Sequence, residues 1–246
     1  MSWKAIVAAA AGIGVASLGA FEMAGPGLGT VLAAPAAAAA APAAAPAVGQ
    51  GTNIDELVVG LTVVKSLPKV PGYERDCTKG KACVYGPAWT DDYTGPSSHD
   101  GCDTRNNVLG TQLVNVRFKP GTRDCKVIGG TLHDPYTGKT IEFDPKKSSA
   151  IQIDHVFPLS RSWSAGASKW TLAQRTSFAN DTALNLLASD GPANQAKSDK
   201  GLDKWMPANA GYRCEYAIKY LTVAKTYQLA VTTSEVDVAR TACSNR

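Results

Sequence analysis

An adjacent acid and histidine are the residues of this sequence best suited to catalysis. Asp154 and His155 interrupt the apolar run Ile151–Leu159, and asparagines follow at Asn185 and Asn194. Two polar side chains buried in such a run need hydrogen-bond partners. One interpretation is therefore structural: the two side chains are hydrogen-bonded within the core. The other interpretation is catalytic, because a neutral imidazole can act as a general base and carboxylate and amide oxygens bind hard divalent cations.

The other two histidines have simpler explanations. His99 lies in a polar loop, where a solvated side chain is usual. His133 ends a β-prone run before a turn, and a hydrogen bond to that turn is expected. We therefore expect any histidine chemistry to centre on His155.

The sequence around these residues predicts two strands and a helix. The run Ile151–Leu159 predicts a strand that ends at Pro158, and Ala183–Ala188 predicts a second, short strand. Gly191-Pro192 then begins a helix over 193–200. Because neighbouring residues on a regular strand face opposite sides, the backbone must bend at the acid–histidine pair for both side chains to act at one place.

This order of elements resembles the ββα-metal core of the HNH endonucleases. The segment Ile153-Asp-His-Val-Phe-Pro158 resembles the first element of that family, and Asn185 and Asn194-x-x-Lys197 resemble the second and third. The last position is Asn rather than His. The same variant occurs in the HNH domains of RNA-guided nucleases, where Asn is a metal ligand.

A wider set of motifs resembles the secreted actinobacterial HNH proteins, which are related to the C-terminal domain of a modification-dependent restriction endonuclease. These motifs are Gly101–Asn106, Asp134–Gly138, Phe178–Asp181, Leu184–Leu187 and Tyr212–Tyr216. The resemblance covers roughly residues 70–243 of the chain.

The resemblance implies metal-assisted hydrolysis of phosphodiester bonds in DNA, with RNA as a second substrate class. His155 would be the general base, and Asn185 would hold the loop that bears it. Asp154 and Asn194 would bind Mg²⁺, with Mn²⁺ or another divalent cation as substitutes. Lys197, one helical turn after Asn194, is a further candidate for contact with a substrate phosphate.

Arg75 and Arg105 are additional candidates for phosphate contacts, because guanidinium groups bind phosphate bidentately. The sequence contains no evident helix-turn-helix, zinc finger or basic stripe, which predicts low sequence specificity. The alternatives are that Asn185 forms a turn and that Lys197 is a solvated surface lysine. Core packing is expected, with base stacking as the alternative, for Trp89, Trp163, Trp170 and Trp205.

Two other functions compete with a nuclease. A non-catalytic secreted binding or envelope protein could retain the same scaffold, although intact Asp154, His155 and Asn194 argue against it. A metal-dependent hydrolase of cell-wall material would need a histidine-rich zinc site, and the three histidines are at least 22 positions apart.

The first fifty residues differ from the rest of the chain. Lys4 precedes an apolar run that ends at Glu22, which indicates a secretory signal peptide over residues 1–34 with an undefined cleavage site. An Ala/Pro-rich linker follows over 35–55, and residues 56–246 form the nuclease domain. We expect a secreted monomer without stable membrane association, and an uncleaved N-terminal membrane anchor is the alternative. The net charge of +4 neither requires nor excludes a nucleic-acid partner.

Six cysteines in a chain with an export signal favour disulfides over thiolate chemistry. The expected pairs are Cys77–Cys83, Cys102–Cys125 and Cys214–Cys243. The first two pairs follow from proximity in the chain. The third follows from two expected helices, over 212–227 and 232–243, whose antiparallel packing would bring the last two cysteines together. A structural zinc is the alternative, although the paired Cys-x-x-Cys spacing is missing.

The remaining patterns complete a disulfide-stabilised α+β fold around the ββα core. An apolar segment, helical or extended, is expected over Leu57–Leu67, and a helix over Thr104–Val116. A small hairpin is expected from Lys126 to Phe143, with its turn at Asp134–Gly138. Capping boxes predict helix starts at Thr171–Gln174 and Thr232–Glu235.

Overall fold

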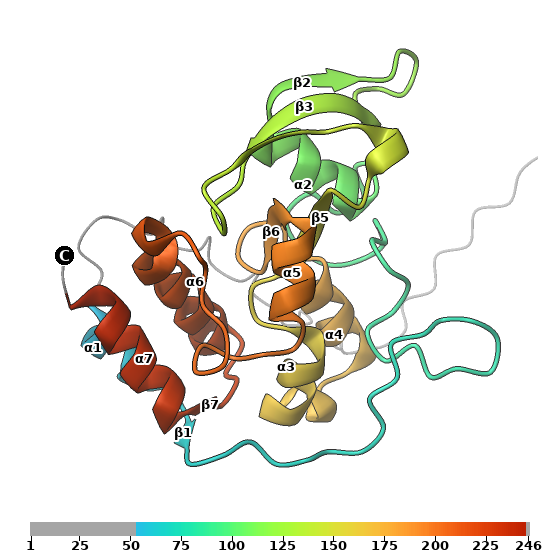
Figure 1. Cartoon of the computed structure of the whole chain (residues 1–246). Helices are drawn as coiled ribbons and strands as arrows, with labels where there is room; N and C mark the ends of the chain where they lie inside the picture. The colour runs from blue at the N-terminus through green and yellow to red at the C-terminus, as the bar shows by residue number, and fades with distance from the viewer. Residues whose placement is uncertain (1–52, 245–246) are drawn as a thin grey trace, which may run out of the picture. The chain divides into compact units, whose positions relative to one another are not determined.

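The structure is a computed structural model, and it describes residues 53–244 (Figure 1). The predicted signal peptide and nearly all of the predicted linker lie outside these residues. The helices are α1 (Ile54–Val58), α2 (Thr104–Gln112), α3 (Leu159–Ala165), α4 (Leu172–Ala179), α5 (Gly191–Lys197), α6 (Arg213–Thr226) and α7 (Thr233–Cys243). The strands are β1 (Val63–Val64), β2 (Val114–Phe118), β3 (Val127–His133), β4 (Thr140–Glu142), β5 (Ile151–His155), β6 (Leu186–Asp190) and β7 (Val231–Thr232). This is the α+β class expected from the sequence.

Strands β5 and β6 form an antiparallel pair, and α5 follows β6 without a connecting loop. The register runs from Ile151 opposite Asp190 to His155 opposite Leu186. Asp190 caps α5, because its side chain accepts a hydrogen bond of 2.9 Å from the backbone of Ala193. Figure 1 shows α5 beside β5 and β6. The expected order of strand, strand and helix is confirmed.

The two faces of the β5–β6 pair have different environments. Alternate residues on one face pack with α2 in a small hydrophobic core that includes Ile151, Ile153, Leu186, Ala188, Val108 and Leu109. The side chain of Asp154 contacts α5 instead, through Lys197. The alternation of apolar and polar residues along β5 therefore places Asp154 against α5.

Helix α2 is joined to the outer edge of β6 by the side-chain amide of Gln112. Its Nε2 donates to the carbonyl of Leu186 at 3.1 Å, and its Oε1 accepts from the backbone N–H of Ala188 at 2.8 Å. The amide thus provides hydrogen-bond partners for backbone groups at the edge of β6, as a neighbouring strand would.

The predicted helix over Thr104–Val116 is too long. It ends at Gln112, and Val114–Phe118 forms strand β2, which pairs with β3 in a three-stranded antiparallel sheet of order β2-β3-β4. Valine and phenylalanine at alternate positions favour a strand here, and the pairing with β3 outweighs the helical spacing. The hairpin formed by β3 and β4 is confirmed as predicted.

The larger core surrounds α6, and its fully buried side chains include Tyr216, Tyr220, Leu221 and Val223. Helices α1 and α7 pack against α6, and β1 pairs in parallel with β7. The apolar segment expected over Leu57–Leu67 is therefore divided between α1 and β1. Both predicted capping boxes are present, at the starts of α4 and α7. Trp163, Trp170 and Trp205 pack in or against this core, as predicted.

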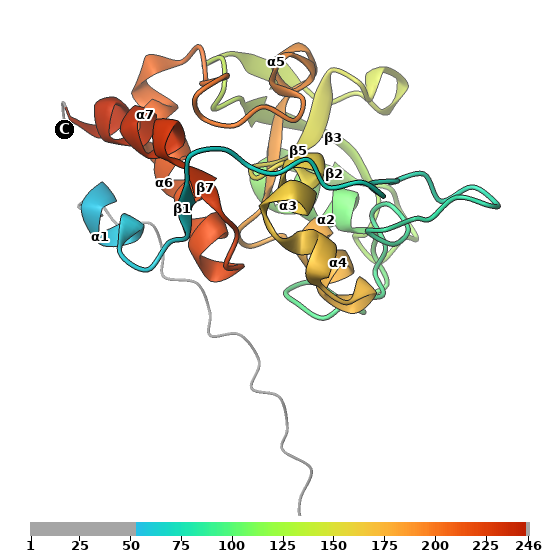
Figure 2. The ribbon, with the colours of Figure 1, turned by 90° about the horizontal axis from the view of Figure 1, so that it is seen from below.

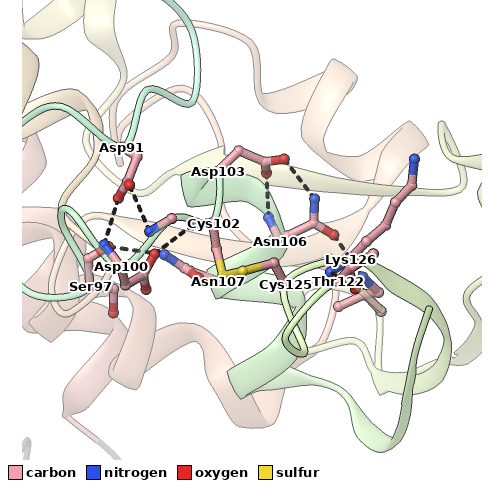
Figure 3. Close-up of a disulfide and its surroundings, with 12 residues drawn as sticks. Asp91, Ser97, Asp100, Cys102, Asp103, Asn106, Asn107, Thr122, Cys125 and Lys126 are labelled. Atoms are coloured by element: carbon pink, nitrogen blue, oxygen red, sulfur yellow. Dashed lines mark hydrogen bonds between the residues drawn. A yellow bond between two sulfur atoms is a disulfide. The ribbon is translucent and has the colours of Figure 1, made fainter. Parts of the chain in front are cut away.

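All three predicted disulfides are present, and no cysteine among residues 53–244 is free. Figure 3 shows the bond between Cys102 and Cys125, which joins the segment before α2 to the segment before β3. The side chain of Asn106 reinforces this junction by accepting a 2.9 Å hydrogen bond from the backbone of Val127. The disulfide and this bond therefore hold α2 against the three-stranded sheet.

In the part of the chain that the structure describes, no helix combines the length and the apolar character that a membrane span requires.

Candidate active site

A cleft of about 460 Å³ brings together residues from three separate segments. Asp154 and His155 contribute from the end of β5, Asn194 from the middle of α5, and Tyr73 and Arg75 from the segment after β1. Figure 2 shows this segment passing across α3. The strand ends at His155 and α3 begins after Pro158. Asp154 and His155 keep regular pairing with Leu187 and Leu186, so the bend expected at the pair is absent and the chain turns only after His155. Both residues nevertheless line the cleft.

The imidazole of His155 is oriented by the backbone. Its Nε2 lies 2.8 Å from the carbonyl oxygen of Ala179. A carbonyl oxygen can only accept a hydrogen bond, so Nε2 carries the hydrogen and Nδ1 keeps its lone pair. Trp89 stacks on the ring, with 5.8 Å between centroids and 12° between planes. His155 therefore presents Nδ1 as the nitrogen that can accept a proton.

The charge state of His155 also suits it to accept a proton. Burial lowers its pKa to about 4, and the bond to the Ala179 carbonyl opposes this shift. The imidazole is consequently neutral at physiological pH, which is the form that a general base requires.

Asn185 lies behind His155 rather than in the cleft, and its side chain is fully buried. Its Oδ1 accepts from the backbone N–H of Phe157 at 2.8 Å, and its Nδ2 donates to the carbonyl of Phe178 at 3.3 Å. The Asn185 carbonyl also accepts from the N–H of Val156 at 2.8 Å. These bonds hold the residues that follow His155, which is the role that the resemblance implies for Asn185.

The carboxylate of Asp154 has a partner on each oxygen. Lys197 Nζ lies 2.8 Å from Oδ1, and the hydroxyl of Tyr136 donates to Oδ2 at 2.5 Å. Asp154 is only 4% exposed and Lys197 is completely buried. Burial lowers the pKa of Lys197, whereas the charge of Asp154 raises it. The two side chains form a buried ion pair between β5 and α5.

Lys197 is buried, and not at the surface as expected for a solvated lysine. Besides Asp154, its ammonium donates to the carbonyl of His155 at 2.8 Å. The side chain of Lys197 is completely buried and does not line the cleft, so it is not placed for the predicted contact with a substrate phosphate. Lys197 instead connects helix α5 to both Asp154 and His155 through hydrogen bonds.

The two candidate arginines have different positions. Arg105 is half-buried and donates from Nη2 to the carbonyls of Ser148 and Ile151, at 3.2 and 3.0 Å, so it supports the start of β5. Arg75 is exposed, lines the cleft, and makes no side-chain ion pair within residues 53–244. It also lines a smaller hollow together with His155 and Trp89. Of the two, only Arg75 is placed to contact a substrate in the cleft.

The cleft offers oxygen donors suited to a hard cation. The amide of Asn194 is oriented by a 2.9 Å hydrogen bond from its Nδ2 to Gln152 Oε1, and both Asn194 and Asp154 line the cleft. Within residues 53–244, no group of three or more His, Cys, Asp or Glu residues could hold a metal ion. Asp154 and Asn194 are the residues that would hold such a cation, and Mg²⁺ would need few protein ligands, since it usually keeps several waters and binds substrate phosphate as well.

Comparisons with known proteins identify the family of this chain. Residues 103–238 match the family model of the C-terminal domain of GmrSD restriction endonucleases. The chain belongs to this family. A protein of Arthroderma benhamiae, described as an uncharacterized secreted protein, is 35% identical over 207 residues, which cover 84% of this chain and 89% of that protein. No solved structure matches the chain.

The segment matched by the GmrSD C-terminal domain family contains most of the site. Asp154, His155, Asn185 and Asn194 lie within residues 103–238, whereas Arg75 precedes them. Tyr136 also lies within the segment, although no sequence pattern predicted a role for it at the site. The available signal was its central position in the Asp134–Gly138 motif, which the resemblance had singled out.

Acid should destabilise the metal-free protein through His155. The unfolded imidazole has a pKa near 6.5 and the folded one about 4. The stability contributed by the neutral folded histidine is therefore fully present above pH 6.5 and is lost as the pH falls toward 4, by about 3 kcal/mol in total. Urea unfolding across this range should show a larger loss for the wild type than for His155→Gln, which cannot acquire the charge. Equal losses would contradict the burial of a neutral His155.

Proposed function

We propose that this protein is a secreted, metal-dependent HNH-type endonuclease that hydrolyses phosphodiester bonds of DNA, with RNA as a second substrate class. The observation that carries the proposal is the cleft itself. It is lined by His155, whose neutral imidazole has no hydrogen bond on Nδ1 within residues 53–244, and by the oxygen donors Asp154 and Asn194. Membership of a restriction endonuclease domain family supports nucleic acid as the substrate.

The reaction needs a base and a source of positive charge, because the water must attack an anion and the leaving alkoxide is unstable. His155 Nδ1 would take the proton from the attacking water, while Nε2–H stays bound to the Ala179 carbonyl. A divalent cation on Asp154 and Asn194 would supply positive charge to the phosphate oxygens and the leaving group. Arg75, which also lines the cleft, would bind a phosphate of the substrate.

The groups assigned to the substrate contact phosphate rather than base edges. We therefore expect low sequence specificity and an affinity for DNA that decreases as the salt concentration rises. Secretion of this protein is supported by its three disulfides and by its similarity to a fungal protein described as secreted. We expect the mature protein to act as a monomer, released from the membrane.

Incubation of the purified mature protein with supercoiled plasmid tests the proposal. Nicked and linear DNA should accumulate with Mg²⁺ or Mn²⁺, and a chelator should stop the reaction, because both Asp154 and Asn194 need the cation to act on phosphate. A parallel series with RNA determines the second substrate class. Binding of DNA without any cleavage would favour the alternative, a secreted binding protein that retains the scaffold, and cleavage unaffected by chelator would contradict metal dependence.

A further inference from the structure

The turn Asp134–Gly138 connects β3 to β4 and has a closely defined geometry. The backbone N–H of Asp134 donates to the carbonyl of Lys139 at 2.8 Å, and that of Gly138 donates to the carbonyl of Asp134 at 2.9 Å. Gly138 adopts a φ of 76°, which favours glycine. The side chain of Asp134 also accepts a 2.7 Å hydrogen bond from the N–H of Thr137. Tyr136 thus occupies the centre of a fixed turn.

This turn is also attached to the elements that carry the candidate metal ligands. Asp134 Oδ1 accepts a 2.9 Å hydrogen bond from the backbone N–H of Asp190, the residue that caps α5. On its other side, Asn209 donates from its backbone to the carbonyl of Tyr136 at 2.9 Å and from Nδ2 to that of Pro135 at 3.1 Å. The turn therefore has a fixed position relative to α5, which bears Asn194.

From this position Tyr136 reaches the carboxylate on β5. Its side chain is completely buried, and its ring packs edge-on against Trp205 and Tyr216, with centroids 4.9 and 5.5 Å apart. Its hydroxyl donates to Asp154 Oδ2 at 2.5 Å. A phenolic O–H can donate and a carboxylate oxygen can only accept, so the hydroxyl is the donor in this contact.

Two donors on opposite oxygens determine how Asp154 is turned. Lys197 holds Oδ1 and Tyr136 holds Oδ2. A carboxylate has about four lone-pair positions, so these two bonds leave others that can face the cleft. Rotation of the carboxylate would break both bonds and leave the buried donors of Lys197 and Tyr136 without a partner.

We infer that Tyr136 is a positioning residue that fixes the Asp154 carboxylate for metal binding, as part of a turn that also positions the start of α5. The inference rests on the proposed function, because it concerns the proposed ligand Asp154. It adds to that function a residue of the turn between β3 and β4, whose own side chain does not line the cleft. Groups that orient a ligand in this way typically change metal affinity or activity by about 10- to 100-fold when they are removed.

Tyr136→Phe tests the inference, because it removes only the hydroxyl. Tyr216→Phe is a matched control: Tyr216 is equally buried in the same aromatic cluster, and its hydroxyl has no hydrogen-bond partner within residues 53–244. We expect Tyr136→Phe to weaken Mn²⁺ binding to the DNA-free protein about 10-fold and to raise the Mn²⁺ concentration needed for half-maximal cleavage by a similar factor. Tyr216→Phe should change neither and should unfold at a urea concentration close to that of the wild type, because its hydroxyl has no partner to lose. Tyr136→Phe should remain folded but unfold at a lower urea concentration, because the buried carboxylate loses a hydrogen bond.

Several results would overturn the inference. Wild-type Mn²⁺ binding by Tyr136→Phe, or equal losses in both variants, would show that the hydroxyl does not position Asp154. A wild-type protein that neither binds Mn²⁺ nor cleaves DNA would instead end the proposed function. In that case a crystal structure of Tyr136→Phe decides separately whether the Asp154 carboxylate turns, and an unchanged carboxylate would overturn the inference.

Discussion

Replacing His155 with alanine should slow DNA cleavage by a factor of about 10² to 10⁴, which is the usual contribution of a general base. The reason is geometric: Nε2 is bound to the Ala179 carbonyl, so Nδ1 is the single ring nitrogen able to accept the proton. DNA affinity should remain unchanged, because the proposed phosphate contact is Arg75. Single-turnover nicking gives the rate, and fluorescence anisotropy with labelled DNA and chelator gives the affinity.

His99→Ala is the control for this substitution. His99 is exposed, bonds to Asp92 at 3.2 Å, and does not line the cleft, so its removal should leave the rate of cleavage unchanged. If His155→Ala cleaves at the wild-type rate while remaining folded, another group is the base and the proposed mechanism is wrong. If instead the His155 variant loses DNA binding, the imidazole contacts the substrate directly.

Asp154→Asn should have two separable effects, one on cleavage and one on stability. Cleavage should fall at least about 100-fold, because a ligand for the cation that stabilises the transition state is lost. Stability should fall by about 3–5 kcal/mol, because the buried ammonium of Lys197 loses its counter-charge. Urea unfolding measures the second effect independently of activity.

The double variant Asp154→Asn/Lys197→Met distinguishes the two effects. Removing both charges leaves no buried ion without a partner, so most of the lost stability should return, while cleavage should stay low. Glu74→Gln is the matched surface control: it breaks the partly exposed pair with Lys81 and should cost less than about 1 kcal/mol. Recovery of cleavage in the double variant would show that Asp154 acts only as the partner of Lys197.

Local sequence patterns were sufficient to predict much of this molecule. The apolar run interrupted by Asp154 and His155 predicted the strand that carries them, and the Gly191-Pro192 step predicted the start of α5. The capping boxes and the three disulfides were also predicted correctly. Each of these features depends on residues close in the chain or on the pairing of cysteines, which narrow the possibilities before any packing is known.

Packing between distant segments decided the rest. Strand β2 forms because β3 lies alongside it, which the helix-like spacing around Val114 could not indicate. The same holds for the burial of Lys197 against Asp154 and for the half-buried position of Arg105, since an isolated basic residue in a sequence resembles a solvated one. The contact of Tyr136 with Asp154 joins two separate sheets. A pattern in the sequence specifies which face of an element is buried, whereas the partner on that face depends on how the elements pack together in the complete fold.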